Sequence, residues 1–147
     1  MTAAPLPGWS PAELDHVGLA VHDLDAAVEL HRSVLGLHLL SVEDVAAHGV
    51  REALLAPGPG PGTRVQLLQP LSDASPVARF LARRGEGLHH LAYRVGSLDD
   101  ALARLATGDP PLQPVAPGVT RGGGGARVAF LHPRDLGGVL TELVERG

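Results

Sequence analysis

The first regular segment of the chain alternates bulky aliphatic side chains with small or polar ones. Across residues 16–21 the aliphatic side chains occupy the odd positions, and His16, Gly18 and Ala20 occupy the even ones. A period of two is typical of a strand with one packed face and one open face. We therefore predict a strand with His16 on its open face, where the two small residues leave room beside the imidazole.

Three helices are predicted from spacing and end signals. The first lies between Asp23, a suitable N-cap, and Gly36, a suitable stop. A second covers about 75–84, because its second residue is a proline, which is favoured in a first helical turn. The third follows Ser97, which resembles a capping box with Asp100. Its apolar residues recur at helical spacing, at Leu98, Ala101, Leu102 and Leu105.

Apolar segments predict further strands near Leu37–Glu43, Val50–Leu55, Thr63–Gln69, Leu112–Val115, Ala126–Leu131 and Val139–Val144. The alternating prolines and glycines of residues 56–62 cannot stay in a ladder, so they predict a hairpin loop. The run Gly122–Gly125 allows two interpretations. We favour a loose hairpin turn, and the alternative is a loop that moves over a ligand.

An internal repeat organises these elements. Leu14–Val21 matches Leu88–Val95 at an offset of 74 residues, and the match pairs His16 with His90. The ends of the two halves correspond at an offset of 76 residues. Repeats of this kind indicate one structural unit used twice.

Each half contains a strand, a helix and three strands. We therefore predict an α+β fold of two βαβββ modules that form a curled mixed sheet around a metal-binding cavity. The modules are expected at about 13–70 and about 87–146, joined by the linker helix 75–84 within a single domain of residues 1–147.

Composition narrows the available chemistry. The net charge is −4 without a basic stripe, which argues against nucleic acid and acidic membranes as partners. The chain has no cysteine, and all twelve basic residues are arginine, which excludes disulfides, thiolate nucleophiles and Schiff bases. Eight histidines and sixteen acidic residues remain, and they favour metal or carboxylate chemistry. No apolar run is long enough to span a bilayer and the N-terminus has no signal-peptide pattern, so we expect a cytoplasmic protein.

Each module places ligand-type side chains on the open faces of its first and last strands. These are His16 and Gln66 in the first module, and His90 and Glu142 in the second. A pseudo-twofold arrangement of the modules would bring all four together. Imidazole and oxygen donors suit a divalent ion such as Zn²⁺, Mn²⁺, Co²⁺, Ni²⁺ or Mg²⁺, with two positions left open for chemistry. The alternative is that the histidines are satisfied core residues and the other two are polar groups at a rim.

Glu52 is a single acid in an otherwise apolar predicted strand. Alternation places it on one face with two aliphatic residues, so its carboxylate is expected in the same cavity. The alternative is a solvated edge charge that pairs with Arg51 or Arg64.

Three other histidines are further candidates. His132 follows a predicted strand and is expected near the cavity rim, whereas His89 is expected to point away from the site because His90 points in. His48 is a candidate without an assigned role.

These residues resemble the vicinal oxygen chelate superfamily and, within it, the methylmalonyl-CoA epimerase family, over about residues 13–145. The resemblance rests on the segments Asp15–Gly18, Gly49–Ala53, Val65–Leu68, Ser75–Leu81, Gly85–Ala92, Phe130–Pro133 and Gly138–Leu143. It implies that His16, Gln66, His90 and Glu142 bind the metal, and that Glu52 and Glu142 are the acid/base pair. It also implies 1,1-proton transfer on (R)- and (S)-methylmalonyl-CoA through a metal-stabilised enolate, by a cytoplasmic homodimer that binds an acyl-CoA substrate.

Other functions of this scaffold stay open at this point. An epimerase for another acyl-CoA, a glyoxalase or an extradiol dioxygenase would also use a metal ion. The dioxygenase needs an iron site of two histidines and one carboxylate, and the additional ligand Gln66 argues against it. A non-catalytic module that binds a small molecule without turnover is the remaining alternative.

Overall fold

The structure is a computed structural model that describes residues 13–147. The chain divides into two compact units. One contains residues 13–15 and Leu91–Gly147, and the other contains His16–His90. The division falls within two strands, β1 (Leu14–Ala20) and β5 (Gly87–Arg94), so each of these strands contributes residues to both units.

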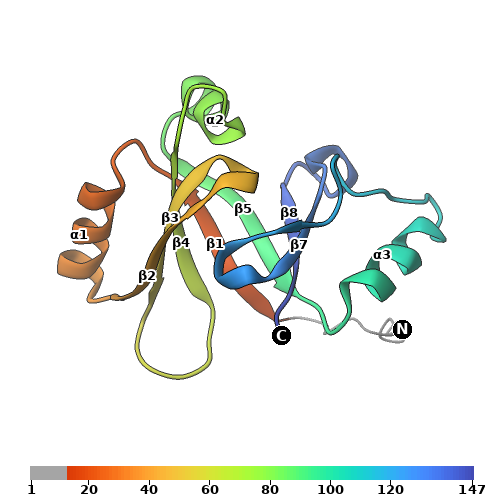
Figure 1. Cartoon of the computed structure of the whole chain (residues 1–147), viewed down its shortest axis with the longest axis horizontal. Helices are drawn as coiled ribbons and strands as arrows, with labels where there is room; N and C mark the ends of the chain where they lie inside the picture. Colours follow the sequence, from red (N-terminus) through yellow and green to blue (C-terminus); the bar gives the residue numbers. More distant parts are fainter. Residues whose placement is uncertain (1–12) are drawn as a thin grey trace. The chain divides into compact units, whose positions relative to one another are not determined.

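The unit His16–His90 contains four strands in the order β2-β3-β4-β1 (Figure 1). The strand β1 pairs with β4 in parallel, whereas β2, β3 and β4 form an antiparallel meander. Its other elements are α1 (Leu24–Leu35), β2 (His38–Val45), β3 (Val50–Ala56), β4 (Arg64–Pro70) and α2 (Pro76–Arg84). The parallel neighbours β1 and β4 are connected through α1, β2 and β3, since parallel strands cannot be joined by a tight turn.

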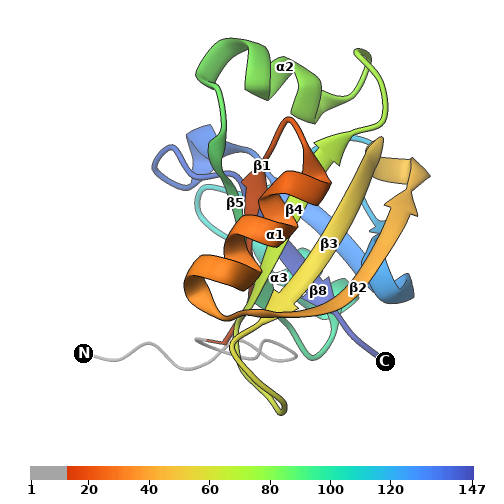
Figure 2. The same cartoon turned by 90° about the vertical axis from the view of Figure 1, so that its left-hand side faces the viewer.

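Helix α1 covers one face of these strands (Figure 2). It begins after Asp23, whose carboxylate accepts a hydrogen bond from the Ala26 amide, and ends at Gly36 in the left-handed conformation. Aliphatic side chains of α1 pack against Leu55 and Leu67. The opposite face carries Ala20, Leu68 and the apolar side of α2. Residues of β1 therefore alternate between the face covered by α1 and the face that carries α2, as the period of two predicts.

The other unit repeats this plan in the order β5-β8-β7-β6. Its elements are α3 (Leu98–Ala106), β6 (Thr120–Arg121), β7 (Arg127–Leu131) and β8 (Thr141–Glu145). The strand β5 pairs with β8 in parallel, and the remaining pairs are antiparallel. Helix α3 packs on one face against Leu143, and Ala92, Val128 and Val144 lie in a separate cluster.

The predicted α+β class and the βαβββ order of both halves are confirmed. The strand predicted at Leu112–Val115 is wrong, since these described residues form no strand. Prolines at 110, 111, 114 and 117 lack the amide hydrogen that a ladder needs, and the two-residue strand β6 takes this place further along the chain. A 3₁₀ turn at Gly123–Gly125 joins β6 to β7, in agreement with the hairpin interpretation. Within residues 13–147, no helix has both the length and the apolar character needed to cross a membrane.

Candidate metal centre

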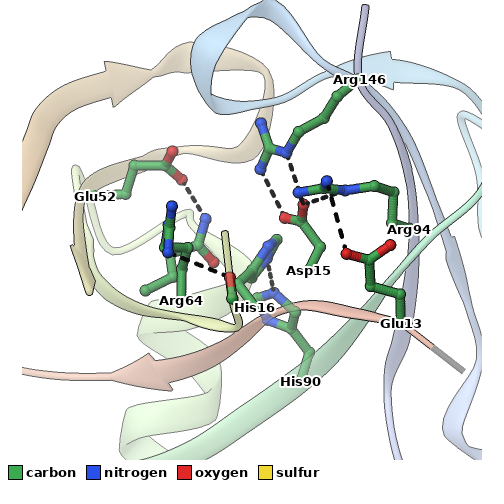
Figure 3. A network of polar contacts seen from close by, with 10 residues as sticks. Glu13, Asp15, His16, Glu52, Arg64, His90, Arg94 and Arg146 are labelled. Carbon is green, nitrogen blue, oxygen red and sulfur yellow. Dashed lines mark hydrogen bonds and ion pairs between the residues drawn. The ribbon is translucent and has the colours of Figure 1, made fainter. Parts of the chain in front are cut away.

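Two buried histidines face each other in the unit His16–His90. Strand alternation turns His16 away from α1, toward the face that also carries Ala20. His90 enters from β5, and its Nε2 lies 3.1 Å from Nε2 of His16 (Figure 3). The two rings are nearly perpendicular, at 89°. The repeat therefore brings together two residues that are 74 positions apart, as predicted for this pair.

Gly18 makes the position of His90 possible. A Cβ atom built on Gly18 would lie 2.2 Å from Cε1 and 2.5 Å from Nδ1 of the His90 ring. The backbone of Gly18 does not need a positive φ, so the reason for glycine here is space. The sequence predicts that Gly18 leaves room beside His16, whereas the structure gives that room to His90.

Gln66 and Glu52 form a second buried pair on the same unit. Gln66 lies opposite Leu54 in the β3–β4 ladder and Glu52 lies opposite Leu68, so the two side chains are diagonal neighbours on one face. Nε2 of Gln66 donates a hydrogen bond of 2.7 Å to Oε2 of Glu52. A carboxylate accepts only, so this contact determines the orientation of the amide and turns Oε1 of Gln66 away from Glu52.

The solvated-edge alternative for Glu52 is wrong, because only 6% of this residue is exposed. Its neighbour Arg51 instead donates from Nε to Asp44 at 2.8 Å on the outer side of the sheet. That hydrogen bond lowers the pKa of the exposed Asp44 carboxyl. Glu52 is therefore a buried carboxylate beside an amide, which is typical of a group with a function rather than of a surface charge.

The donor atoms in this unit fit a divalent ion. Among the described residues, Oε1 of Gln66 is the buried side-chain polar atom that has no hydrogen-bond partner, and such an atom calls for an explanation. Two nitrogens that each lie about 2.1 Å from one ion, at right angles, are about 3.0 Å apart. The observed separation of 3.1 Å between the two imidazole Nε2 atoms agrees with this value. Two imidazoles and an amide oxygen are suitable ligands for Zn²⁺, Co²⁺ or Mn²⁺.

Glu142 belongs to the other unit and is also buried. It lies in β8 between Ala92 of β5 and Phe130 of β7, and its neighbour Leu143 points to the opposite face, toward α3. The carboxylate therefore lies on the face that α3 leaves uncovered. Glu142 thus offers a buried carboxylate, a donor type that suits a divalent ion.

Asp15 has no role that the sequence predicts, and its carboxylate is almost fully buried. Within its own unit, Asp15 accepts hydrogen bonds from Arg94 at 2.8 Å and from Arg146 at 2.7 Å through each of its oxygens (Figure 3). Asp15 directly precedes His16 in β1. The sequence shows only an acid directly before the predicted strand 16–21, because the partners of Asp15 lie 79 and 131 residues away.

The three other candidate histidines have different positions. His48 ends a 3₁₀ turn before β3, and Nδ1 of His132 accepts a hydrogen bond from the Arg134 amide in another 3₁₀ turn. Nδ1 of His89 lies 2.9 Å from Nδ1 of His90, on the other ring nitrogen from the one that faces His16. Adjacent strand residues point to opposite faces on average, but these two imidazoles still meet at their Nδ1 atoms.

Comparisons with known proteins identify the family to which this chain is similar. The model of the Glyoxalase/Bleomycin resistance protein/Dioxygenase superfamily matches residues 15–130. The ethylmalonyl-CoA/methylmalonyl-CoA epimerase of Cereibacter sphaeroides is 37% identical over 139 residues, which cover 88% of this chain and 95% of that protein. The crystal structure of methylmalonyl-CoA epimerase from Mycobacterium tuberculosis matches with a TM-score of 0.88 and 43% identity, covering 100% of this chain and 93% of that one. A methylmalonyl-CoA epimerase in complex with methylmalonyl-CoA and NH4+ matches with a TM-score of 0.83 and 39% identity, covering 92% of this chain and 94% of that one.

Proposed function

The chain belongs to the glyoxalase/bleomycin resistance protein/dioxygenase superfamily, and on that premise we propose that it is a metal-dependent epimerase that interconverts (R)- and (S)-methylmalonyl-CoA. Its similarity to two methylmalonyl-CoA epimerases over nearly the whole chain supports this substrate. The enzyme is then an isomerase that acts on an acyl-CoA, and the proposal includes a cytoplasmic homodimer.

The reaction requires removal of a weakly acidic proton from a carbon next to a thioester. When bound, a divalent ion would supply Lewis acidity at the thioester oxygen, where negative charge develops. We assign His16, Gln66, His90 and Glu142 as its ligands. The hydrogen bond from Gln66 to Glu52 fixes the rotation of the amide and would leave the amide oxygen available to the ion.

Inversion of the carbon needs a carboxylate on each side of it. One carboxylate removes the proton and the other returns a proton to the opposite face. We assign these roles to Glu52 and Glu142, which are two of the three buried acids among the described residues. The third, Asp15, accepts hydrogen bonds from two arginines. Gln66 donates to Oε2 of Glu52, which orients that carboxylate, and burial of Glu52 keeps bulk water from competing for the substrate proton.

One observation carries the proposal. The amide oxygen of Gln66, which has no hydrogen-bond partner, and the two facing imidazoles provide buried ligand atoms next to a buried carboxylate. A protein that only packed these groups in its core would leave this oxygen without a partner, at a cost of about 1–3 kcal/mol. A bound ion would remove that cost, and the neighbouring Glu52 would give the site a base.

The test is solvent exchange with a matched pair of variants. The Co²⁺-loaded protein is incubated with one stereoisomer of methylmalonyl-CoA in deuterated water, and both deuterium at the α-carbon and optical purity are followed. We expect exchange together with loss of optical purity. Glu52→Gln retains an acceptor for the Gln66 amide and should bind Co²⁺ normally, but exchange should fall at least about 100-fold, as for the loss of a general base. The control Glu29→Gln lies on the exposed surface of α1 and should behave like the wild type.

Three outcomes would contradict the proposal. Absence of exchange in the metal-loaded wild type would favour another enzyme of this superfamily. Binding of the acyl-CoA without turnover and without metal would favour a non-catalytic module. Full activity of Glu52→Gln would show that this carboxylate is not a base.

A further inference from the structure

Both ring nitrogens of His90 have a nitrogen neighbour in the unit His16–His90. Nε2 lies 3.1 Å from Nε2 of His16, and Nδ1 lies 2.9 Å from Nδ1 of His89. A neutral imidazole has one N–H donor and one acceptor nitrogen. For Nε2 of His90 to serve as a metal ligand, its proton must be on Nδ1, and that proton then points at His89.

We propose that His89 is a positioning residue for His90, in which Nδ1 of His89 accepts the Nδ1–H of His90 and thereby turns the Nε2 lone pair of His90 toward the proposed metal ion. This inference rests on the proposed function, because it concerns a ligand of the proposed metal. Ligating histidines almost always donate their second N–H to such an acceptor, which fixes both the tautomer and the ring orientation. The acceptor is usually a carboxylate, a backbone carbonyl or a water, and here an imidazole takes that place.

Helix α2 holds the ring of His89 in the orientation that this role needs. The Phe80 ring lies 4.9 Å from the His89 ring in an edge-to-face arrangement at 76°, which is a favourable geometry for aromatic pairs. The guanidinium of Arg84 lies 6.0 Å from the centre of the Phe80 ring. The same helix is anchored by Val77 and Leu81 in an apolar cluster with Ala20. His89 is therefore supported by a packed helix rather than by a loop.

The contact between His89 and His90 has no counterpart at the matching position of the other module. At the offset of 74 residues that matches His16 with His90, the residue before the histidine is Asp15 in one module and His89 in the other. The carboxylate of Asp15 is occupied by Arg94 and Arg146. His89 instead contacts the adjacent imidazole directly, so the two modules use this position differently.

Two substitutions at His89 separate the acceptor from the ring. His89→Phe keeps an aromatic ring against Phe80 but removes the acceptor, whereas His89→Asn can place an amide oxygen where Nδ1 lies and loses the ring. The apo forms are titrated with Co²⁺ by calorimetry, their visible Co²⁺ spectra are recorded, and their thermal midpoints are compared. His38→Phe, at an exposed position of β2, is the matched control for a histidine-to-phenylalanine change.

We expect His89→Phe to weaken Co²⁺ binding about 10- to 100-fold, the range typical of a lost outer partner of a ligand, and to change the Co²⁺ spectrum. His89→Asn should bind within about threefold of the wild type, and His38→Phe should match it. Wild-type affinity in His89→Phe, or equal losses in both His89 variants, would overturn the acceptor role. Failure of the wild type to bind Co²⁺ would instead overturn the proposed metal site, which separates the two hypotheses.

Discussion

Gly18→Ala is the smallest change that should disable the candidate centre. The added Cβ would lie 2.2 Å from Cε1 of His90, and ordinary contact begins at 3.4 Å, so the imidazole has to move by about 1.2 Å. Metal–ligand distances tolerate deviations of only about 0.2 Å. His90 would therefore leave coordination distance, although the backbone at position 18 accepts alanine without strain.

The expected losses follow from this displacement. Co²⁺ affinity should fall at least about 100-fold, the upper end of the effect of losing an outer partner, because a ligand itself is displaced. A misplacement of about 1 Å costs catalysis about 100-fold, so kcat of the metal-saturated variant should fall by a similar factor. Overpacking should lower the free energy of unfolding by about 1–3 kcal/mol, which leaves the protein folded.

The assay combines calorimetric Co²⁺ titration, the deuterium-exchange rate and urea unfolding. Gly58→Ala is the control, because among the described residues no atom lies within 4 Å of the position of its Cβ. It should retain wild-type metal affinity and activity. If Gly18→Ala bound Co²⁺ as tightly as the control while remaining folded, the position of the His90 ring against β1 would be wrong.

Two further substitutions test other parts of the structure. Gln66→Leu removes the proposed oxygen ligand and the hydrogen bond to Glu52. It should weaken Co²⁺ binding at least about 10-fold. It should also lower the free energy of unfolding in urea by about 1–3 kcal/mol, because the buried Glu52 carboxylate loses a hydrogen-bond donor. Unchanged metal affinity would remove Gln66 from the ligand set. Asp15→Asn should lower the free energy of unfolding by about 3 kcal/mol, because it breaks a buried ion pair. This value is the lower end of the usual range, since the side chains of Arg94 and Arg146 are 40% and 32% exposed and water screens part of the interaction. A loss below about 1 kcal/mol would mean that this network contributes little to stability.

The sequence predicts the helices well because their ends are chemically marked. Asp23, Ser75 and Ser97 each cap the helix that follows, as their hydroxyl or carboxyl oxygens accept from the first-turn amides. The strand expected at Leu112–Val115 does not form. Its apolar residues suggest pairing, but the surrounding prolines remove the donors on which pairing depends. Prediction from local sequence therefore works for helix ends, where one capping residue decides. It fails for this strand, because prolines remove the backbone amide donors along the segment.

Part of the candidate site is also predictable from alternation and repetition. The offset of 74 residues pairs His16 with His90, and the structure brings these two rings together. Glu52 is predicted on the same face as apolar neighbours, and it is buried there against Gln66. The role of Gly18 and the contact of His89 with His90 are not predictable in this way. Both depend on how closely β1 and β5 approach and on the width of an imidazole.

By itself, the sequence of this protein determines which residues alternate, which segments end in caps, and which residues correspond in its two halves, because periodicity and local hydrogen bonding act within a few residues. The tertiary structure alone decides which atoms meet. The Gln66 amide donates to Glu52, the His90 ring packs in the open space at Gly18, and Asp15 accepts from two arginines. Such partners are separated by 14 to 131 residues. Their contacts arise from strand register and packing, which no local pattern encodes.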